Sequence, residues 1–274
     1  MRIVYDIDTL LPYINWAYYY HAWQVKDAAQ QQHVRHEAET FLGTVATRYH
    51  AYALVRIEHA HAHGDDIMVR RSDSPAATAS FAIPCLRQQQ GDTCFCLADF
   101  ISPDPHSSSL IDNTIGIFAT SVDAGMEHDF DQDPYQKMMA QLLADRLAEA
   151  AAERLHEEVR KHLWGYAPAE DLSYEAMQQE HFQGIRPAVG YPSLPDASLN
   201  FVLDQLLDMQ QIGIRLTESG AMRPHASVSG LMMAHSQARY FNLGKIGEDQ
   251  LSDYARRRGL PLSVMRKFLA GNLC

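Results

Sequence analysis

The chain has 274 residues, 46% of them hydrophobic and 21% charged, which is typical of a globular protein with a sizeable core. Its 34 acidic and 23 basic side chains give a formal charge of −11. This balance argues against nucleic acid as a partner, because nucleic-acid binding relies on clustered Lys and Arg. No apolar run approaches about 18 residues and the N-terminus lacks a signal peptide's apolar core, so we expect a cytoplasmic protein without membrane contact.

The N-terminal part of the chain is expected to be helical. Apolar and aromatic side chains recur at helical spacing over residues 8–24 and again over 36–53. The sequence shows no internal repeat or low-complexity linker. We therefore expect a helical N-terminal extension over residues 1–60, packed on a main domain that forms a single unit over 61–274.

Strand-forming runs follow these helices, over residues 67–70, 79–83 and 115–121. Between the second and third runs, Asp99 is the single carboxylate in the apolar stretch 94–100. Burying an unpaired carboxylate is costly. Asp99 is therefore expected to cap an element, pair with a cation or serve a function.

Two patterns imitate metal-binding motifs without completing them. His59, His61 and His63 alternate as zinc ligands on a strand would, but no Cys or carboxylate of suitable spacing completes the set. The aspartates of 129–133 imitate the start of a calcium loop, but Pro134 stands where that motif requires glycine. The four cysteines lack paired metal spacing as well. We expect no metal-ligating residues.

The strongest helix prediction covers residues 134–163, where Pro134 suits the first turn and apolar residues recur at helical spacing. Asp145 and Glu149 are four residues apart and therefore project from one face. Two interpretations are open for this pair. It belongs to a solvated face, or it lines a site for a cation.

The segment 184–192 holds two glycines and two prolines, which exclude a helix or a central strand. It carries one cation, Arg186, and one aromatic residue, Tyr191, while Gly190 allows a ligand to approach the backbone closely. One interpretation is a binding loop for a small anionic or zwitterionic molecule. The other is a rigid turn whose Arg186 pairs with a neighbouring carboxylate.

Further elements are expected toward the C-terminus. Asp196 is predicted to cap a helix that runs to about residue 211. Small and hydroxylated residues over 216–222 and 226–230 suit strands that lie close to a ligand or another backbone. Tyr240 and Phe241 fall in a predicted strand over 239–243, where they either stack on a ligand or belong to the core. The remaining predicted helices span residues 173–180, 248–258 and 263–269.

Six segments of the sequence occur in the same order as in the activation domain of cobalamin-dependent methionine synthase. They are residues 97–100, 144–149, 164–166, 184–192, 216–219 and 226–230. The chain resembles this family over most of its length, and most closely from Leu97 onward.

The resemblance implies an α+β fold, in which a curved antiparallel β-sheet is flanked by helices and a shallow groove holds the ligand. It also implies S-adenosylmethionine as that ligand. In the family, inactive cob(II)alamin on another domain receives one electron, typically from flavodoxin, and is then remethylated. Because the leaving group is a neutral thioether, no general base is required, and no catalytic residue is expected in this chain.

The same resemblance implies the residues of the S-adenosylmethionine site. They are Asp99, Glu149, Arg186, Ala188, Gly190, Tyr191, Tyr240 and Phe241, the last standing where the family often has a second tyrosine. Arg186 can donate two hydrogen bonds to the ligand carboxylate. Asp99 and Glu149 can bind the ligand ammonium or offset the charge of its sulfonium. Main-chain groups and aromatic rings of the remaining residues can line the adenosine.

The sequence departs from the family at Arg223 and His225, where an aromatic residue and a glycine are usual, and at Val189, which replaces a proline. Nothing in the chain matches a region for homocysteine, methyltetrahydrofolate or cobalamin. We therefore expect a free-standing activation domain. Its partners would be a cobalamin-binding methionine synthase core on another chain and flavodoxin or a similar electron donor.

Two other functions are consistent with these residues. One is a non-catalytic S-adenosylmethionine-binding module that senses the ligand or stabilises a corrinoid protein. The other is a binding domain that does not use S-adenosylmethionine at all. The residues by themselves do not determine whether the chain acts as an enzyme subunit.

Overall fold

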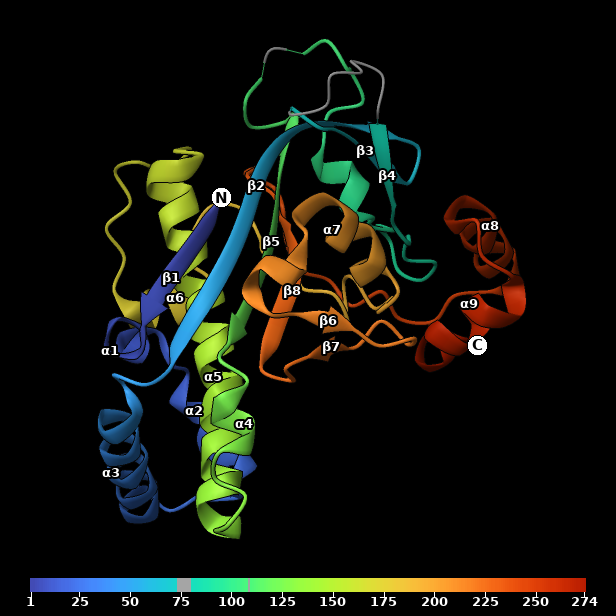
Figure 1. Cartoon of the computed structure of the whole chain (residues 1–274). Helices are drawn as coiled ribbons and strands as arrows, with labels where there is room; N and C mark the ends of the chain where they lie inside the picture. The colour runs from blue at the N-terminus through green and yellow to red at the C-terminus, as the bar shows by residue number, and fades with distance from the viewer. Residues whose placement is uncertain (73–79, 108) are drawn as a thin grey trace.

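The computed structural model describes residues 1–72, 80–107 and 109–274. An antiparallel sheet forms its centre, and helices lie against both faces of that sheet (Figure 1). The architecture is the α+β fold with a curved, helix-flanked sheet that the sequence predicted.

Strand β2 organises the sheet. One edge of β2 pairs with β1 near its start and with β3 near its end, while the other edge pairs with β5, and all these pairings are antiparallel. Beyond them, β4 pairs with β3 and β8 pairs with β5, so the strand order is β4-β3-β2-β5-β8. The strands are β1 (Arg2–Asp6), β2 (His50–His63), β3 (Asp66–Arg70), β4 (Ser80–Pro84), β5 (Thr114–Val122) and β8 (Ser227–Met232).

Every residue of β5 is buried, because helices cover the strand from both sides. Helix α5 (Pro134–Glu158) packs on one face and α7 (Leu199–Leu207) on the other, each with its own apolar core. The hydroxyl of Thr120 donates a hydrogen bond to the Ala148 carbonyl of α5, at 3.0 Å. Burial on both faces explains why the sequence of β5 is a nearly continuous apolar run.

The long helix predicted over residues 134–163 is confirmed. Asp133 caps it by accepting backbone hydrogen bonds from Tyr135 and Gln136. A π-helical turn, η3 (Val159–Leu163), continues α5. Alanines recur along the buried face of α5, so the helix axis can approach the sheet closely.

The N-terminal segment is only partly helical, which corrects two predictions. Residues 50–53 were expected to end a helix over 36–53, but α3 stops at Val45 and these residues begin β2. Alternation of apolar and polar side chains there fits a strand, and pairing with β1 and β5 decides it. Residues 1–60 therefore supply β1 and most of β2 to the main sheet. Their helices are α1 (Ile7–Leu10), η1 (Leu11–Tyr13), α2 (Trp16–Ala22) and α3 (Ala28–Val45).

The helix predicted over residues 196–211 is broken. It consists of α7 and a 3-10 turn, η4 (Met209–Ile212), separated by Asp208, whose φ is 55°. Asp196 does not cap α7 as predicted, because Ser198 occupies the N-cap position. The carboxylate of Asp196 instead accepts hydrogen bonds from the Ser198 backbone and the Tyr254 hydroxyl.

The remaining elements are short. The hairpin of β6 and β7 replaces a single strand over 216–222, and of the strand predicted over 79–83, residue 79 lies outside the described residues. These elements are η2 (Leu97–Phe100), α4 (Gly125–His128), α6 (Tyr174–Gln178), β6 (Arg215–Leu216), β7 (Met222–Arg223), α8 (Glu248–Arg258), α9 (Leu262–Phe268) and η5 (Ala270–Asn272). Within the described residues, no helix combines the length and apolarity needed to span a bilayer.

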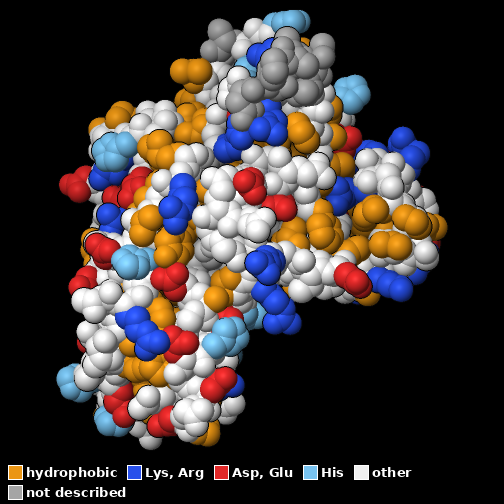
Figure 2. Space-filling model, viewed as in Figure 1, with side chains coloured by type: hydrophobic (Ala, Val, Ile, Leu, Met, Phe, Trp, Pro, Cys, Tyr) orange, Lys and Arg blue, Asp and Glu red, His pale blue; other side chains and the backbone are white. Residues whose placement is uncertain are grey.

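Helices α8 and α9 build a small core of their own beside the sheet. Apolar side chains gather on their surface, whereas acidic and basic side chains are intermixed elsewhere on the same face (Figure 2). The fully buried Tyr254 of α8 donates its hydroxyl hydrogen bond to Asp196 at 2.8 Å. This bond ties the C-terminal helices to the segment that precedes α7.

Strand β8 holds the 184–192 segment against the sheet through backbone hydrogen bonds and one very close approach. The Leu231 backbone N–H donates to the Pro187 carbonyl at 3.0 Å. A Cβ atom at Gly230 would lie 2.3 Å from the Pro187 carbonyl oxygen and 2.8 Å from the Ala188 Cα. Only glycine therefore allows the loop to lie this near to the strand.

We expect Gly230→Ala to lower the free energy of unfolding by about 1–3 kcal/mol, because the added methyl group overpacks this contact. Urea unfolding measures the change. Gly43→Ala is the control, since a Cβ at Gly43 meets nothing within 4 Å and a helical alanine should stabilise α3 by about 0.5–1 kcal/mol. An unchanged urea midpoint for Gly230→Ala would show that the loop can move away.

Candidate ligand-binding site

A cavity of about 650 Å³ opens between α5, the 184–192 loop and the N-terminal segment. Its volume lies in the range of small-molecule sites, about 300–1,000 Å³. Six of the eight residues predicted for the site line it. They are Glu149, Arg186, Ala188, Tyr191, Tyr240 and Phe241.

The segment carrying Tyr240 and Phe241 is irregular, and the strand predicted over residues 239–243 is absent there. Hydrogen bonds nevertheless fasten it to the 184–192 loop. The Arg186 backbone N–H donates to the Tyr240 hydroxyl oxygen at 2.8 Å. The Ser193 hydroxyl donates to the Phe241 carbonyl at 2.7 Å. Local side-chain contacts, rather than a strand ladder, therefore bring both aromatic residues to the cavity.

Arg186 is paired with a carboxylate at the cavity wall. Its side chain is 12% exposed, and its Nη2 donates to Glu153 Oε2 at 2.9 Å. Burial, the largest single influence, acts to lower the pKa of Arg186, but the negative charges of Glu153, Tyr240 and Glu149 together outweigh it and the pKa is raised. Of the two interpretations of the 184–192 segment, the structure therefore shows the one in which Arg186 pairs with a neighbouring carboxylate.

This ion pair is not saturated by hydrogen bonds. Within the described residues, Arg186 Nε and Glu153 Oε1 are both buried and have no hydrogen-bond partner. A buried donor or acceptor without a partner is costly. The pair therefore leaves one buried donor and one buried acceptor unsatisfied next to the cavity.

Glu149 lies one helical turn before Glu153 on α5 and also lines the cavity. Its Oε1 accepts a hydrogen bond from the Tyr191 hydroxyl at 2.6 Å. Burial, and then the charge of Glu149, raises the pKa of Tyr191 above its usual value of 10. Asp145, predicted to share a face with Glu149, lies 3.1 Å from the His225 ring instead.

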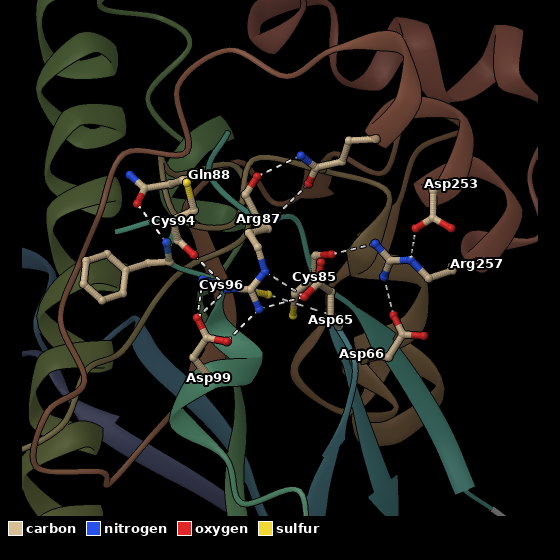
Figure 3. A network of polar contacts seen from close by, with 12 residues as sticks. Asp65, Asp66, Cys85, Arg87, Gln88, Cys94, Cys96, Asp99, Asp253 and Arg257 are labelled. Atoms are coloured by element: carbon tan, nitrogen blue, oxygen red, sulfur yellow. Dashed lines mark hydrogen bonds and ion pairs between the residues drawn. The ribbon is translucent and has the colours of Figure 1, made fainter. Parts of the chain in front are cut away.

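Asp99 belongs to a separate polar network (Figure 3). Its two carboxylate oxygens accept hydrogen bonds from Arg87 at 2.6 and 2.8 Å, and one of them also accepts from the Cys96 backbone. The bonds to Asp99 raise the pKa of Arg87. Asp99 is thus paired, and it lies outside the described residues that line the cavity.

Phe95, four residues before Asp99 in the chain, contacts the cavity wall. The Phe95 ring lies 6.1 Å from the cavity-lining Phe241 ring, measured between centroids. Gly190 also stands outside the lining, with φ of 89° and open space around the position of a Cβ. Gly190 therefore flanks the cavity, since Ala188 and Tyr191 on either side of it are lining residues.

Several cavity residues were not predicted. Glu153 repeats the helical spacing of Glu149, so the four-residue periodicity of α5 could have revealed it. Glu180 follows α6 with φ of 59°, and burial followed by the charge of Glu153 raises its pKa. Tyr13 and Tyr18 come from the N-terminal segment, and no local sequence pattern indicates that it reaches the cavity.

A buried charged layer supports the cavity behind Phe182. The Phe182 ring lies 4.9 Å from the His156 ring and 4.2 Å from the Arg160 guanidinium carbon. Arg160 is fully buried and binds Glu170 through two nitrogens. Burial, and then the charges of Arg160 and Arg186, lower the pKa of His156 well below 6.5.

The fold and this cavity define a small-molecule-binding α+β domain. A family model described as "Vitamin B12 dependent methionine synthase, activation domain" matches residues 6–259, and the chain belongs to this family. A solved structure titled "Crystal Structure of the MetH Reactivation Domain bound to AdoHcy" is similar to it. That likeness has a TM-score of 0.91 and 35% sequence identity, and it covers 100% of this chain and 90% of the other. The resemblance inferred from six motifs is confirmed.

We expect Glu153→Gln to reduce the free energy of unfolding by about 2 kcal/mol, because Arg186 then keeps a mostly buried charge without its ionic partner. Urea unfolding again measures the loss. The control is Glu39→Gln, whose exposed pair with Arg35 should contribute less than about 0.5 kcal/mol. Equal effects of the two variants would contradict a special role for Glu153.

The neutral His156 should make stability depend on pH. Below about pH 6.5 the unfolded chain protonates this histidine while the folded chain does not, so the unfolded state binds more protons and stability falls as pH falls. Between about pH 7.5 and pH 5.5, the unaltered protein should lose about 1.4 kcal/mol more than a His156→Gln variant. Urea unfolding at both pH values tests this, and parallel losses would refute it.

Proposed function

We propose that this chain binds S-adenosylmethionine in the cavity and supports reductive remethylation of inactive cob(II)alamin on a separate methionine synthase core. The Arg186–Glu153 pair, which lines the cavity and keeps a buried donor and a buried acceptor without partners, is the observation that carries this proposal. The similar solved structure was obtained with AdoHcy, according to its title, and this is the demethylated form of the proposed ligand.

The charges of the cavity match this ligand. S-adenosylmethionine carries a sulfonium, an ammonium and a carboxylate, and therefore a net charge of about +1 near neutral pH. The cavity is lined by the carboxylates of Glu149, Glu153 and Glu180 and by the guanidiniums of Arg146 and Arg186, an excess of one negative charge. Opposite charges at such close range stabilise binding.

The polar groups also suit the two ends of the amino-acid portion. Arg186 Nε is a donor for the ligand carboxylate, and Glu153 Oε1 is an acceptor for the ammonium. Tyr240 and Phe241 offer aromatic surface for the adenosine portion. Ala188 leaves its main chain accessible beside them. Gly190, which flanks the cavity, completes the proposed site at its edge. Asp99 would join the site only by exchanging its bonds to Arg87 for the ligand.

The contribution of the domain is to position the ligand. Bound S-adenosylmethionine supplies a methyl group to a one-electron-reduced cobalamin, which a cobalamin-binding partner chain presents and flavodoxin or a similar donor reduces. The residues of this chain hold the amino-acid and adenosine ends, so the methyl group is presented in a fixed direction. The departing thioether is neutral, and no side chain needs to move a proton.

Calorimetric titration of S-adenosylmethionine tests the binding site. We expect saturable binding that Arg186→Ala weakens by about 10- to 100-fold, the loss of one charge-assisted hydrogen bond. Arg35→Ala, on the exposed face of α3, should bind as the unaltered protein does. A folded Arg186→Ala protein with unchanged affinity would exclude this site, and absence of binding by the unaltered protein would exclude the ligand.

Methyl transfer to a cob(II)alamin-loaded methionine synthase core under reducing conditions tests the activity. Methylcobalamin should form only when this chain and S-adenosylmethionine are both present. Ligand binding without methyl transfer would instead indicate a non-catalytic S-adenosylmethionine sensor or stabilising module.

A further inference from the structure

The hairpin of β6 and β7 places two arginines directly opposite each other. Arg215 of β6 faces Arg223 of β7 in the pairing register, and both residues are exposed. Side chains directly opposite in an antiparallel pair extend from the same face, with Cβ atoms about 4.5–5.5 Å apart. The hairpin therefore brings two positive charges close together on one exposed surface.

Neither guanidinium is neutralised by the part of the chain that the structure describes. The exposed Arg35, for example, has an acidic partner there in Glu39. The side chains of Arg215 and Arg223, by contrast, form no ion pair or hydrogen bond with a described residue. Like charges directly opposite each other destabilise a hairpin. A negatively charged partner would remove this repulsion.

A hydrogen bond connects the end of this hairpin to α5, the helix that lines the cavity. His225 follows Arg223 by two residues, and its ring lies 3.1 Å from Asp145, which precedes the cavity-lining Arg146 in the chain. Figure 2 shows Lys and Arg side chains over the hairpin, where the outline of the molecule turns inward between α4 and α5 on one side and α8 and α9 on the other. The two arginines therefore belong to a surface that extends from the cavity-lining helix.

The charge of the whole chain makes this surface distinctive. With a formal charge of −11, the protein as a whole repels an acidic partner. Two adjacent guanidiniums offer planar, bidentate hydrogen bonds to carboxylates at one location. Such local complementarity mainly speeds the formation of a complex and fixes its orientation. The surface that matches this hairpin therefore carries carboxylates.

We propose that Arg215 and Arg223 form a docking site for carboxylates on the surface of the cobalamin-binding partner chain. This inference rests on the proposed function, because that function requires a second protein to approach the cavity. The family usually has an aromatic residue at the position of Arg223. The charged pair would therefore make this chain selective for a methionine synthase core with an acidic surface at the point of contact.

The test measures the Kd of this chain for the cob(II)alamin-loaded methionine synthase core by biolayer interferometry. The variants are Arg215→Glu, Arg223→Glu and the double variant. We expect each single reversal to weaken binding of the core about tenfold in low salt, which is about 1.4 kcal/mol, and the double reversal to weaken it further. The difference should shrink in about 1 M salt, because salt screens exposed charges. The Kd for S-adenosylmethionine, measured by calorimetry, should change less than about twofold, because the hairpin is separate from the cavity lining.

Thermal unfolding separates docking from folding. Each single reversal creates an Arg–Glu pair across the hairpin in place of two like charges, so the unfolding temperature should stay unchanged or rise slightly. Weaker binding of the core by these variants is then a property of the docking surface and not of a damaged fold.

Arg70→Glu is the matched control, since it changes the net charge by the same amount. Arg70 is also exposed and lies in a strand, but near the start of β5, whereas the hairpin leads into β8 near the end of β5. It should leave the Kd for the core unchanged. Unchanged binding by both hairpin variants, or an equal loss for Arg70→Glu, would overturn the docking site alone. Failure of the unaltered protein to bind the core would overturn the proposed function as well.

Discussion

The ion pair between Arg186 and Glu153 connects the two parts of the molecule on which the cavity depends, the long helix α5 and the 184–192 loop. Both side chains are mostly buried, so neither charge can be stabilised by water alone, and each requires the other. The loop must therefore remain at a fixed distance from α5. Every other proposed contact to the ligand is built around this distance.

The backbone around the pair restricts the loop further. Gly230 lets Pro187 and Ala188 approach β8, and the backbone N–H of Arg186 binds the Tyr240 hydroxyl. The loop is thus held by α5, by the sheet and by the segment before α8. A site built on such restrained elements is preorganised, and this reduces the entropy lost when a ligand binds.

The departures from the family occupy two different environments. Val189 packs against the core on the α7 side of the sheet. Arg223 faces Arg215 directly across the β6–β7 hairpin, and like charges in this position are unfavourable; no contact in the described structure explains this arrangement. His225 is 86% exposed and pairs with Asp145, which precedes the cavity-lining Arg146 in the chain.

Local sequence patterns determined those parts of the protein whose residues interact along the chain. The periodicity of α5, the apolar run of β5 and the ordered motifs sufficed for the fold class, the family and six residues of the cavity. Where the local pattern fitted two structures, tertiary pairing decided. Residues 50–53 became a strand because β1 and β5 bind both edges of β2.

Only the tertiary structure decided which charges face the ligand. It paired Asp99 with Arg87 and Asp145 with His225. It also brought Tyr18 into the lining of a cavity whose other residues lie mostly more than a hundred positions away. The physical reason is that a side chain's partner is set by distance in space. Spacing along a sequence reports that distance only within one helix or one pair of strands.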